Sequence, residues 1–143
     1  MFDIEKEWIH CGLPCVVIMG HEMGTRCGYV GVFLNHPFYG DEYQDHYDLE
    51  VHGGLTYSGG HGYPSELSHW ITNPRSLAEI EVPFWWFGYD CAHLHDGRDM
   101  DILMKYSPKF AEIHSQFSHP NDVVRSLEYC IAECESLASE LTE

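Results

Sequence analysis

Positively charged residues are scarce in this sequence. Its 143 residues include 7 Lys and Arg against 23 Asp and Glu, which gives a formal net charge of −16. Such a surface repels a phosphate backbone, so the composition argues against nonspecific binding to nucleic acids. The acidity favours either a well-solvated surface or an acidic protein that imitates the charge of DNA and occupies a DNA-binding partner.

Long apolar runs are also missing. No stretch approaches the roughly 20 apolar residues of a membrane helix, and residues 1–8 are charged where a signal peptide would be apolar. We therefore expect a cytoplasmic protein without a membrane partner. The length is typical of one domain, and because no repeat or Pro/Ser-rich linker divides the chain, we expect a single domain over residues 1–143.

Several familiar catalytic patterns are absent. The sequence contains no Walker loop, no dinucleotide-binding glycine fingerprint and no His-Glu-x-x-His motif. It also lacks the Gly-x-Ser-x-Gly motif, which argues against Ser58 as a hydrolase nucleophile. Any activity must therefore come from a less common arrangement of residues.

The six cysteines lack the secretory context in which they would form a disulfide framework. Cys130 and Cys134 are spaced to share one face of a helix, which favours buried thiols in an apolar seam. The alternative is a zinc site formed by Cys11, Cys15 and Cys27, although three residues separate the first pair where most zinc knuckles have two.

Hydrophobic patterning predicts four strands. Apolar runs indicate buried strands at residues 13–19 and 26–34, joined as a hairpin, and the aromatic segment 82–92 indicates a central strand. Residues 48–58 alternate between apolar and polar side chains, which predicts a fourth strand. In that strand the polar face would carry His52, Thr56 and Ser58.

The C-terminal third is helical in pattern. An apolar stripe from Val123 to Leu141 predicts a long helix capped by Ser118 or Asn121, and residues 108–117 predict a shorter one before it. Residues 37–48 and 59–76 have the composition of loops. The fold class is therefore α+β, with a single antiparallel or mixed sheet of about four to five strands and the long C-terminal helix packed on one face.

Titratable side chains concentrate in residues 90–96 (DCAHLHD), directly after the aromatic strand. A turn here would bring the Asp90 carboxylate within hydrogen-bond reach of the His93 ring. A carboxylate that accepts from one imidazole nitrogen prepares the other nitrogen to act as a base, an acid or a metal ligand. The alternative is that Asp90 caps the turn and His93 satisfies a neighbouring carbonyl.

A metal site is the more specific form of this hypothesis. His93, His95 and Asp96, supplemented by His52 or Asp90, would offer ligands that zinc or manganese accepts. The His-x-His pattern is a weak signal in a chain with 11 histidines. Our prediction is therefore that no cofactor is bound, with a metal at these residues as the alternative.

Several stretches of the chain resemble a family of small uncharacterised phage and prophage proteins. The likeness runs in order from residue 26 to 141, with nothing matched in residues 100–121, and in that family glycine usually stands where this chain has His95. The matching stretches are residues 27–32 (CGYVGV), 36–37 and 39–40 (HP and YG), 51–58 (VHGGLTYS), 85–93 (WWFGYDCAH) with Asp96, and Arg125 with 128–129 (EY) and 137–138 (LA).

This resemblance implies a phage-type accessory protein in the host cytoplasm. By analogy with other small phage proteins, we expect it to bind a nucleotide-derived ligand, as a counter-defence sponge for an immune second messenger. A homo-oligomer is also expected. The residues expected to contact the ligand are Arg26, His52, Thr56, Tyr57, Ser58, Trp86, Asp90, His93 and Asp96.

Two alternatives remain open at the level of the sequence. One is a hydrolase or phosphodiesterase that degrades such a signal in the same pocket, with His52 and His93 exchanging protons and Asp90 orienting one of them. The other is an acidic protein-binding inhibitor of a host defence protein, which needs no pocket.

Overall fold

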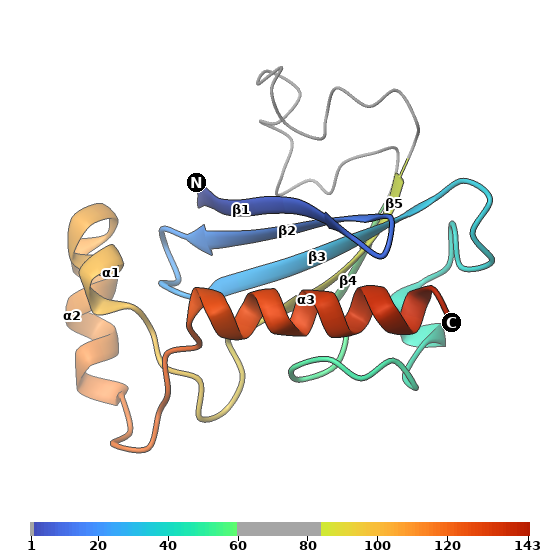
Figure 1. Ribbon diagram of the computed structural model, residues 1–143. Helices are drawn as coiled ribbons and strands as arrows, with labels where there is room; N and C mark the ends of the chain where they lie inside the picture. Colours follow the sequence, from blue (N-terminus) through green and yellow to red (C-terminus); the bar gives the residue numbers. More distant parts are fainter. Residues whose placement is uncertain (1, 60–83) are drawn as a thin grey trace.

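The computed structural model of the protein describes residues 2–59 and 84–143. The chain alternates short connections with regular elements, and most of the sheet comes before the helices (Figure 1). The elements are β1 (Phe2–His10), β2 (Leu13–Gly20), β3 (Arg26–Phe33), the 3-10 turn η1 (Tyr43–Asp45), β4 (Tyr57–Gly59), β5 (Phe84–Asp90), α1 (Met100–Tyr106), α2 (Pro108–Phe117) and α3 (Leu127–Leu141).

The five strands form one antiparallel sheet in the order β1-β2-β3-β5-β4. Helix α3 crosses one face of this sheet, while α1 and α2 lie together at one end of it (Figure 1). The predicted α+β class, the strand number and the helix packed on one face are confirmed. None of the described helices has the length and apolar character needed to cross a membrane.

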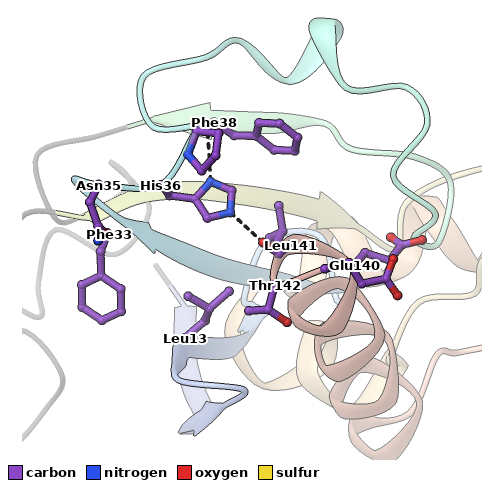
Figure 2. Close-up of a pocket in the computed structure, with 10 residues that line it drawn as sticks. Leu13, Phe33, Asn35, His36, Phe38, Glu140, Leu141 and Thr142 are labelled. Atoms are coloured by element: carbon purple, nitrogen blue, oxygen red, sulfur yellow. Dashed lines mark hydrogen bonds between the residues drawn. The ribbon is translucent and has the colours of Figure 1, made fainter.

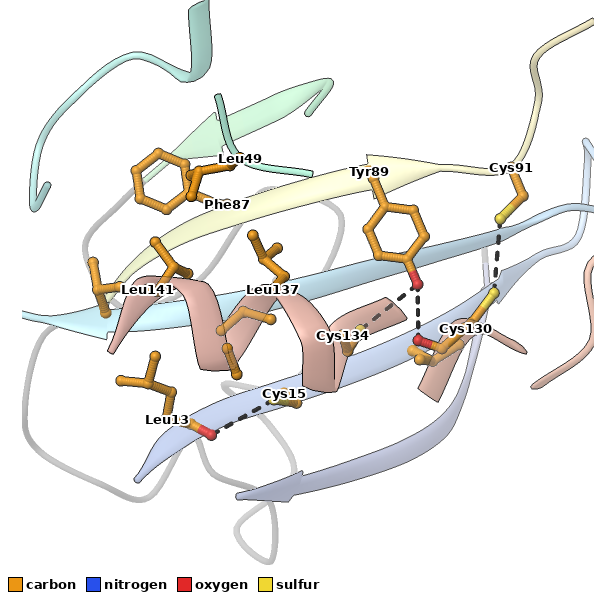
Figure 3. Packing of buried hydrophobic residues seen from close by; sticks show 14 residues of the cluster. Leu13, Cys15, Leu49, Phe87, Tyr89, Cys91, Cys130, Cys134, Leu137 and Leu141 are labelled. Carbon is orange, nitrogen blue, oxygen red and sulfur yellow. Dashed lines mark hydrogen bonds between the residues drawn. The ribbon is translucent and has the colours of Figure 1, made fainter. Parts of the chain in front are cut away.

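The sheet separates two apolar clusters because successive strand residues point to opposite faces. Beneath α3, the inward-facing side chains of β2, β3 and β5 meet the helix residues Cys130, Cys134 and Leu137, all fully buried. Figure 3 shows Tyr89 reaching toward the helix, where its hydroxyl donates to the Cys130 carbonyl at 2.9 Å. Val16, Ile18, Tyr29, Phe84 and Trp86 form the other cluster, on the opposite face.

All six cysteines are free thiols, and all but the exposed Cys11 pack in or against the two apolar clusters. The predicted helical seam is confirmed, since Cys130 and Cys134 are both buried beneath α3. The zinc hypothesis is wrong: Cys15 belongs to the cluster under α3, whereas Cys27 packs on the opposite cluster. Burial raises the pKa of the Cys15 thiol to about 12, which opposes the thiolate form that zinc binds.

The strand predicted at residues 48–58 is much shorter. Only Tyr57–Gly59 pairs with β5, and the preceding residues form turns. Gly53 and Gly54 adopt left-handed φ angles of 68° and 81°, and the Gly54 N–H closes a turn onto the Val51 carbonyl at 2.8 Å. Glycines in this conformation end a strand, so the apparent alternation did not reflect an extended backbone.

The boundaries predicted for the remaining strands and for the shorter helix agree with the structure. The strands at residues 13–19 and 26–34 and the helix at 108–117 are confirmed within two residues. The strand predicted at residues 82–92 is confirmed as Phe84–Asp90, and its first two predicted residues lie outside the described part of the chain, as do residues 60–76 of the predicted loop. β1 and α1 were not predicted.

The long helix begins four residues later than predicted, at Leu127. Its cap is Ser126, whose hydroxyl accepts from the Tyr129 N–H, rather than Ser118 or Asn121. Val123, expected in the first turn, instead forms an isolated parallel bridge with Asp96. The Gly97 N–H donates to the Val123 carbonyl at 2.7 Å and the Val123 N–H to the His95 carbonyl at 2.9 Å.

Candidate functional site

The turn after β5 places one carboxylate, Asp96, at the centre of a polar cluster. The Asp96 N–H donates to the His93 carbonyl at 2.9 Å, and the bridge to Val123 fixes the other side of the turn. The side chain of Asp96 is only 1% exposed. We call this group, consisting of His52, His93, Asp96, Arg125 and Tyr129, the Asp96 cluster.

Three donors satisfy the Asp96 carboxylate. Oδ2 accepts from His52 Nε2 at 2.8 Å and from the His93 backbone N–H at 3.0 Å, and Oδ1 accepts from Arg125 Nε at 2.8 Å. Burial by itself would raise the pKa of this carboxyl, but the hydrogen bonds from Arg125, His52 and the His93 backbone lower it below its ordinary value. Asp96 is therefore ionised at neutral pH and holds its neighbours in place.

His52 lies in the turn before β4 and is held at both ring nitrogens. Because Nε2 donates to the ionised Asp96, Nδ1 is the acceptor, and it receives the Tyr129 hydroxyl at 2.7 Å. His52, before β4, and Tyr129, on α3, lie 77 residues apart in sequence. The role predicted for His52 in exchanging protons would require it to give up one of these two bonds.

His93 has a different environment, because its Nδ1 atom is buried and forms no hydrogen bond with the described residues. That nitrogen lies 3.4 Å from Asp90 Oδ1 and 3.6 Å from Asp96 Oδ2. The ring packs against the Cα of Gly53, where any Cβ would overlap it. In the HGG motif both glycines therefore turn the chain, and Gly53 also leaves space for the His93 ring.

The structure brings together most of the polar residues predicted for the site. His52 and His93 lie with their ring centroids 5.7 Å apart, and Asp90 and Asp96 both face the His93 ring. Within the described residues, the one group of side chains spaced to hold a metal ion is His52, His93 and Asp96, whose ligand atoms lie within 4.8 Å of one another. His95 is not part of it; its backbone has a positive φ of 73°, and its ring faces His119.

The predicted aromatic residues lie elsewhere. Trp86 is fully buried in the cluster on the sheet face opposite α3, and Tyr57 packs beside it with an edge contact to Tyr29. The space beside Gly88 in β5 is filled by the Tyr29 ring. The structure therefore does not bring an indole or a phenol from these positions to His52 and His93.

Two other residues predicted to contact the ligand, Arg26 and Ser58, already have side-chain partners in the protein, and a third, Thr56, pairs with β5 through its backbone. Arg26 forms a fork with the Glu5 carboxylate at 2.6 and 3.2 Å, and its Nη1 donates to the Arg125 carbonyl at 2.8 Å. The Ser58 hydroxyl accepts from the Tyr43 N–H at 3.0 Å. The Thr56 N–H donates to the Gly88 carbonyl at 2.8 Å. Arg26 thus anchors the segment that carries Arg125 instead of presenting a cation to a ligand.

A cleft of about 480 Å³ opens on the other side of the turn from His52. His93 and Asp96 line it, and its far wall comes from the end of α2 and the segment that follows. Below, "the cleft" means this hollow. The lining side chains used in the argument that follows are His93, Arg98, His114, Phe117 and His119.

A second hollow of about 480 Å³ lies at the C-terminal end of α3 (Figure 2). His36 lies at its wall, and its Nδ1 accepts from the Phe38 N–H at 2.9 Å. Nε2 therefore carries the proton and donates to the Leu141 carbonyl at 2.6 Å. This histidine satisfies a carbonyl at the end of the helix, which gives the HP motif a structural role.

Sequence reasoning missed the residues that complete the site. Arg125 and Tyr129 are among the residues that carry the family resemblance, so the resemblance could have suggested them as site residues. The cleft residues Arg98, His114 and His119 come from or adjoin a stretch with no recognised motif. Comparisons of the chain with protein-family models, with curated proteins and with solved structures find no match.

Proposed function

We propose that this protein binds a small nucleotide-derived ligand in the cleft beside the His93 turn. The observation that carries the proposal is the cleft itself, where imidazoles and the Arg98 guanidinium gather on a chain of net charge −16, alongside Asp122 and the Asp96 carboxylate, which Arg125 already pairs. Its volume of about 480 Å³ lies within the range of small-molecule sites. The sequence predicted a pocket that includes His52, whereas the cleft is lined by His93 and Asp96 but not by His52.

Arg98 is the residue we assign to a phosphate group. Its Nη1 donates to the Met23 carbonyl at 2.9 Å, and among the described residues its Nε and Nη2 groups make no hydrogen bond or ion pair. A guanidinium held by one nitrogen can present the others to an anion in a fixed orientation. Phe117, which is 78% exposed at the rim of the cleft, offers a face on which a base can stack.

His114 supplies a neutral hydrogen-bonding group next to this cation. Burial and the nearby charge of Arg98 lower the pKa of its imidazole below the ordinary value. A neutral imidazole both donates and accepts, so it can recognise hydroxyl groups or a base edge. The combination of one cation with the neutral imidazole of His114 suits a small ligand with one or two phosphates better than a nucleic-acid strand.

The biological setting is proposed from the family resemblance. A phage-type protein that holds a nucleotide signal without degrading it would act as a counter-defence sponge in the host cytoplasm. Homo-oligomer formation remains a prediction from the sequence.

The hydrolase alternative is favoured by one specific observation, the position of His93. Its Nδ1 faces the carboxylates of Asp90 and Asp96, so either can orient the ring while Nε2 acts as a general base toward a ligand in the cleft. In this alternative His52 positions Asp96 and does not exchange protons. The reaction class would be hydrolysis of a phosphoester.

A nucleotide panel tests the proposal. The protein is incubated with cyclic, linear and ADP-ribose-type nucleotides, and binding is measured by the shift in melting temperature and by calorimetric titration. The ligand released on heat denaturation is then identified. Intact ligand supports the sponge, and a hydrolysed product supports the enzyme. A panel with no binder contradicts both and favours the protein-binding inhibitor.

Two variants locate the binding site on the molecule. Arg98→Ala should weaken binding by about 10- to 100-fold, because a charge-assisted hydrogen bond contributes about 1.5–3 kcal/mol. The matched control is Lys109→Ala, which removes the same charge from an exposed position of α2 that does not line the cleft. Equal losses in both variants would indicate a general electrostatic effect and would contradict binding in the cleft.

A further inference from the structure

We propose that His52, His93 and Asp96 form a binding site for a divalent transition-metal ion such as zinc. This site goes beyond the proposed nucleotide binding and does not depend on it. Two imidazoles and one carboxylate are a donor set that zinc, manganese and iron all accept. Their ligand atoms lie within 4.8 Å of one another, although the residues are up to 44 positions apart in sequence.

The distances between the donor atoms are close to those around a bound ion. Ligands at about 2.1 Å from a tetrahedral zinc ion lie about 3.4 Å from each other. Asp96 Oδ2 lies 2.8 Å from His52 Nε2 and 3.6 Å from His93 Nδ1. These two separations bracket the value expected around the ion, and all three ligand atoms lie within 4.8 Å of one another, so a modest rearrangement of the side chains would bring them to coordination distances.

The groups around the three ligands are those that a metal site requires. Ligating histidines usually form a hydrogen bond through the second ring nitrogen, and ligating carboxylates are hydrogen-bonded in turn. His52 has Tyr129 at its other nitrogen, and Asp96 has Arg125 on its other oxygen. When His52 Nε2 binds the ion, its proton moves to Nδ1 and the Tyr129 hydroxyl changes from donor to acceptor, so the hydrogen bond is kept.

His93 provides the independent observation. Its buried Nδ1 forms no hydrogen bond with the described residues, a state that is costly for a polar atom. The ring is nevertheless held in this position, because Gly53 has no side chain to obstruct it. An ion coordinated by Nδ1 explains why the chain keeps this nitrogen turned inward, toward Asp96.

The site adjoins the ligand cleft. His93 and Asp96 line the cleft as well as contributing to the proposed site. Asp90, whose Oδ1 lies 3.4 Å from His93 Nδ1, adds a negative charge beside the three ligands. With three protein ligands, a further position would remain for water or for a phosphate oxygen, as in catalytic zinc sites.

The test is titration of the metal-free protein with Co²⁺, whose visible absorption reports tetrahedral binding, followed by competition with Zn²⁺. We expect about one ion per chain in the unmodified protein. His93→Ala should weaken binding more than tenfold, because loss of even an outer partner of a metal ligand costs about 10- to 100-fold. Circular dichroism of the same samples checks that the variant is folded.

His95→Ala distinguishes the proposed ligands from the set predicted by sequence. It should bind Co²⁺ as the unmodified protein does, since its ring lies outside the group. The proposal is overturned if the unmodified protein binds no ion, if folded His93→Ala binds as tightly, or if His95→Ala loses binding to the same extent. The nucleotide panel, run with and without EDTA, is read separately, so that failure of one proposal leaves the other standing.

Discussion

The core beneath α3 and the Asp96 cluster are both completed by α3 and its first turn, yet they are held together by different forces. The core joins apolar side chains and thiols over the length of the helix, whereas the cluster joins charged and polar groups beside its first turn. Apolar burial is nondirectional and nearly independent of pH. The cluster depends on specific donors and on the ionisation of one carboxylate, so the two regions should respond differently to substitution and to acid.

The largest expected effects compare one residue from each region. Leu137→Ala should lower the free energy of unfolding by about 3 kcal/mol, within the usual cost of a cavity in a core. Asp96→Asn should cost a similar amount, because it breaks a buried ion pair and leaves one side of Arg125 unpaired. Urea denaturation at neutral pH measures both.

Acid separates these two variants. The pKa of Asp96 is lowered in the folded protein, so its stabilising contribution is present above the unfolded value of about 3.9 and is lost as the pH falls through the lower folded value. The deficit of Asp96→Asn should shrink below about pH 4, while that of Leu137→Ala should persist. Parallel pH profiles for the two variants would mean that Asp96 is not ionised in the fold.

A smaller effect is expected at the two glycines that shape the cluster. Gly54→Ala should cost about 1 kcal/mol, since its φ of 81° strains an alanine but its surroundings are open. Gly53→Ala should cost about 2–3 kcal/mol, because its methyl group would also displace the His93 ring. Thermal denaturation gives the difference between them, and similar values would show that His93 does not pack on Gly53.

The smallest effect concerns the start of α3, where the two regions meet. Ser126→Ala should cost about 1 kcal/mol, because the side chain caps the Tyr129 N–H. Ser118→Ala, at a cap position predicted from the sequence, should stay within about 0.5 kcal/mol. Urea denaturation of the pair checks the assignment; a larger loss at Ser118 would place the helix start earlier than Leu127.

The fold could be predicted where apolar patterning was continuous. Residues 13–19 and 26–34 form strands because long apolar runs bury both faces of a sheet. β1 was missed because its partly buried and exposed residues alternate irregularly around a bulge between Ile4 and Lys6. The apparent strand at residues 48–58 failed because left-handed glycines outweighed its alternation.

The polar part of the site was more predictable than its aromatic part. His52 and Asp96 were expected to meet, and they do so at 2.8 Å. Trp86 was expected beside them, but alternation along β5 sends its side chain to the other face of the sheet. The cleft could not be predicted, because His114 and His119 approach the turn through the tertiary packing of α2, which leaves no periodic signal in the sequence.

The parallel bridge between Asp96 and Val123 makes the α1–α2 segment a closed excursion from the rest of the chain. Residues 98–122 leave and return at neighbouring points, and this span contains the stretch, residues 100–121, that matches none of the family motifs. The bridge therefore keeps Asp96 in register with the segment that carries Arg125, while the start of α1 is tied separately to the β2–β3 connection, where the Asp99 N–H donates to the Gly24 carbonyl at 2.7 Å. Substitutions in α2 would therefore alter the far wall of the cleft without changing any residue of the Asp96 cluster.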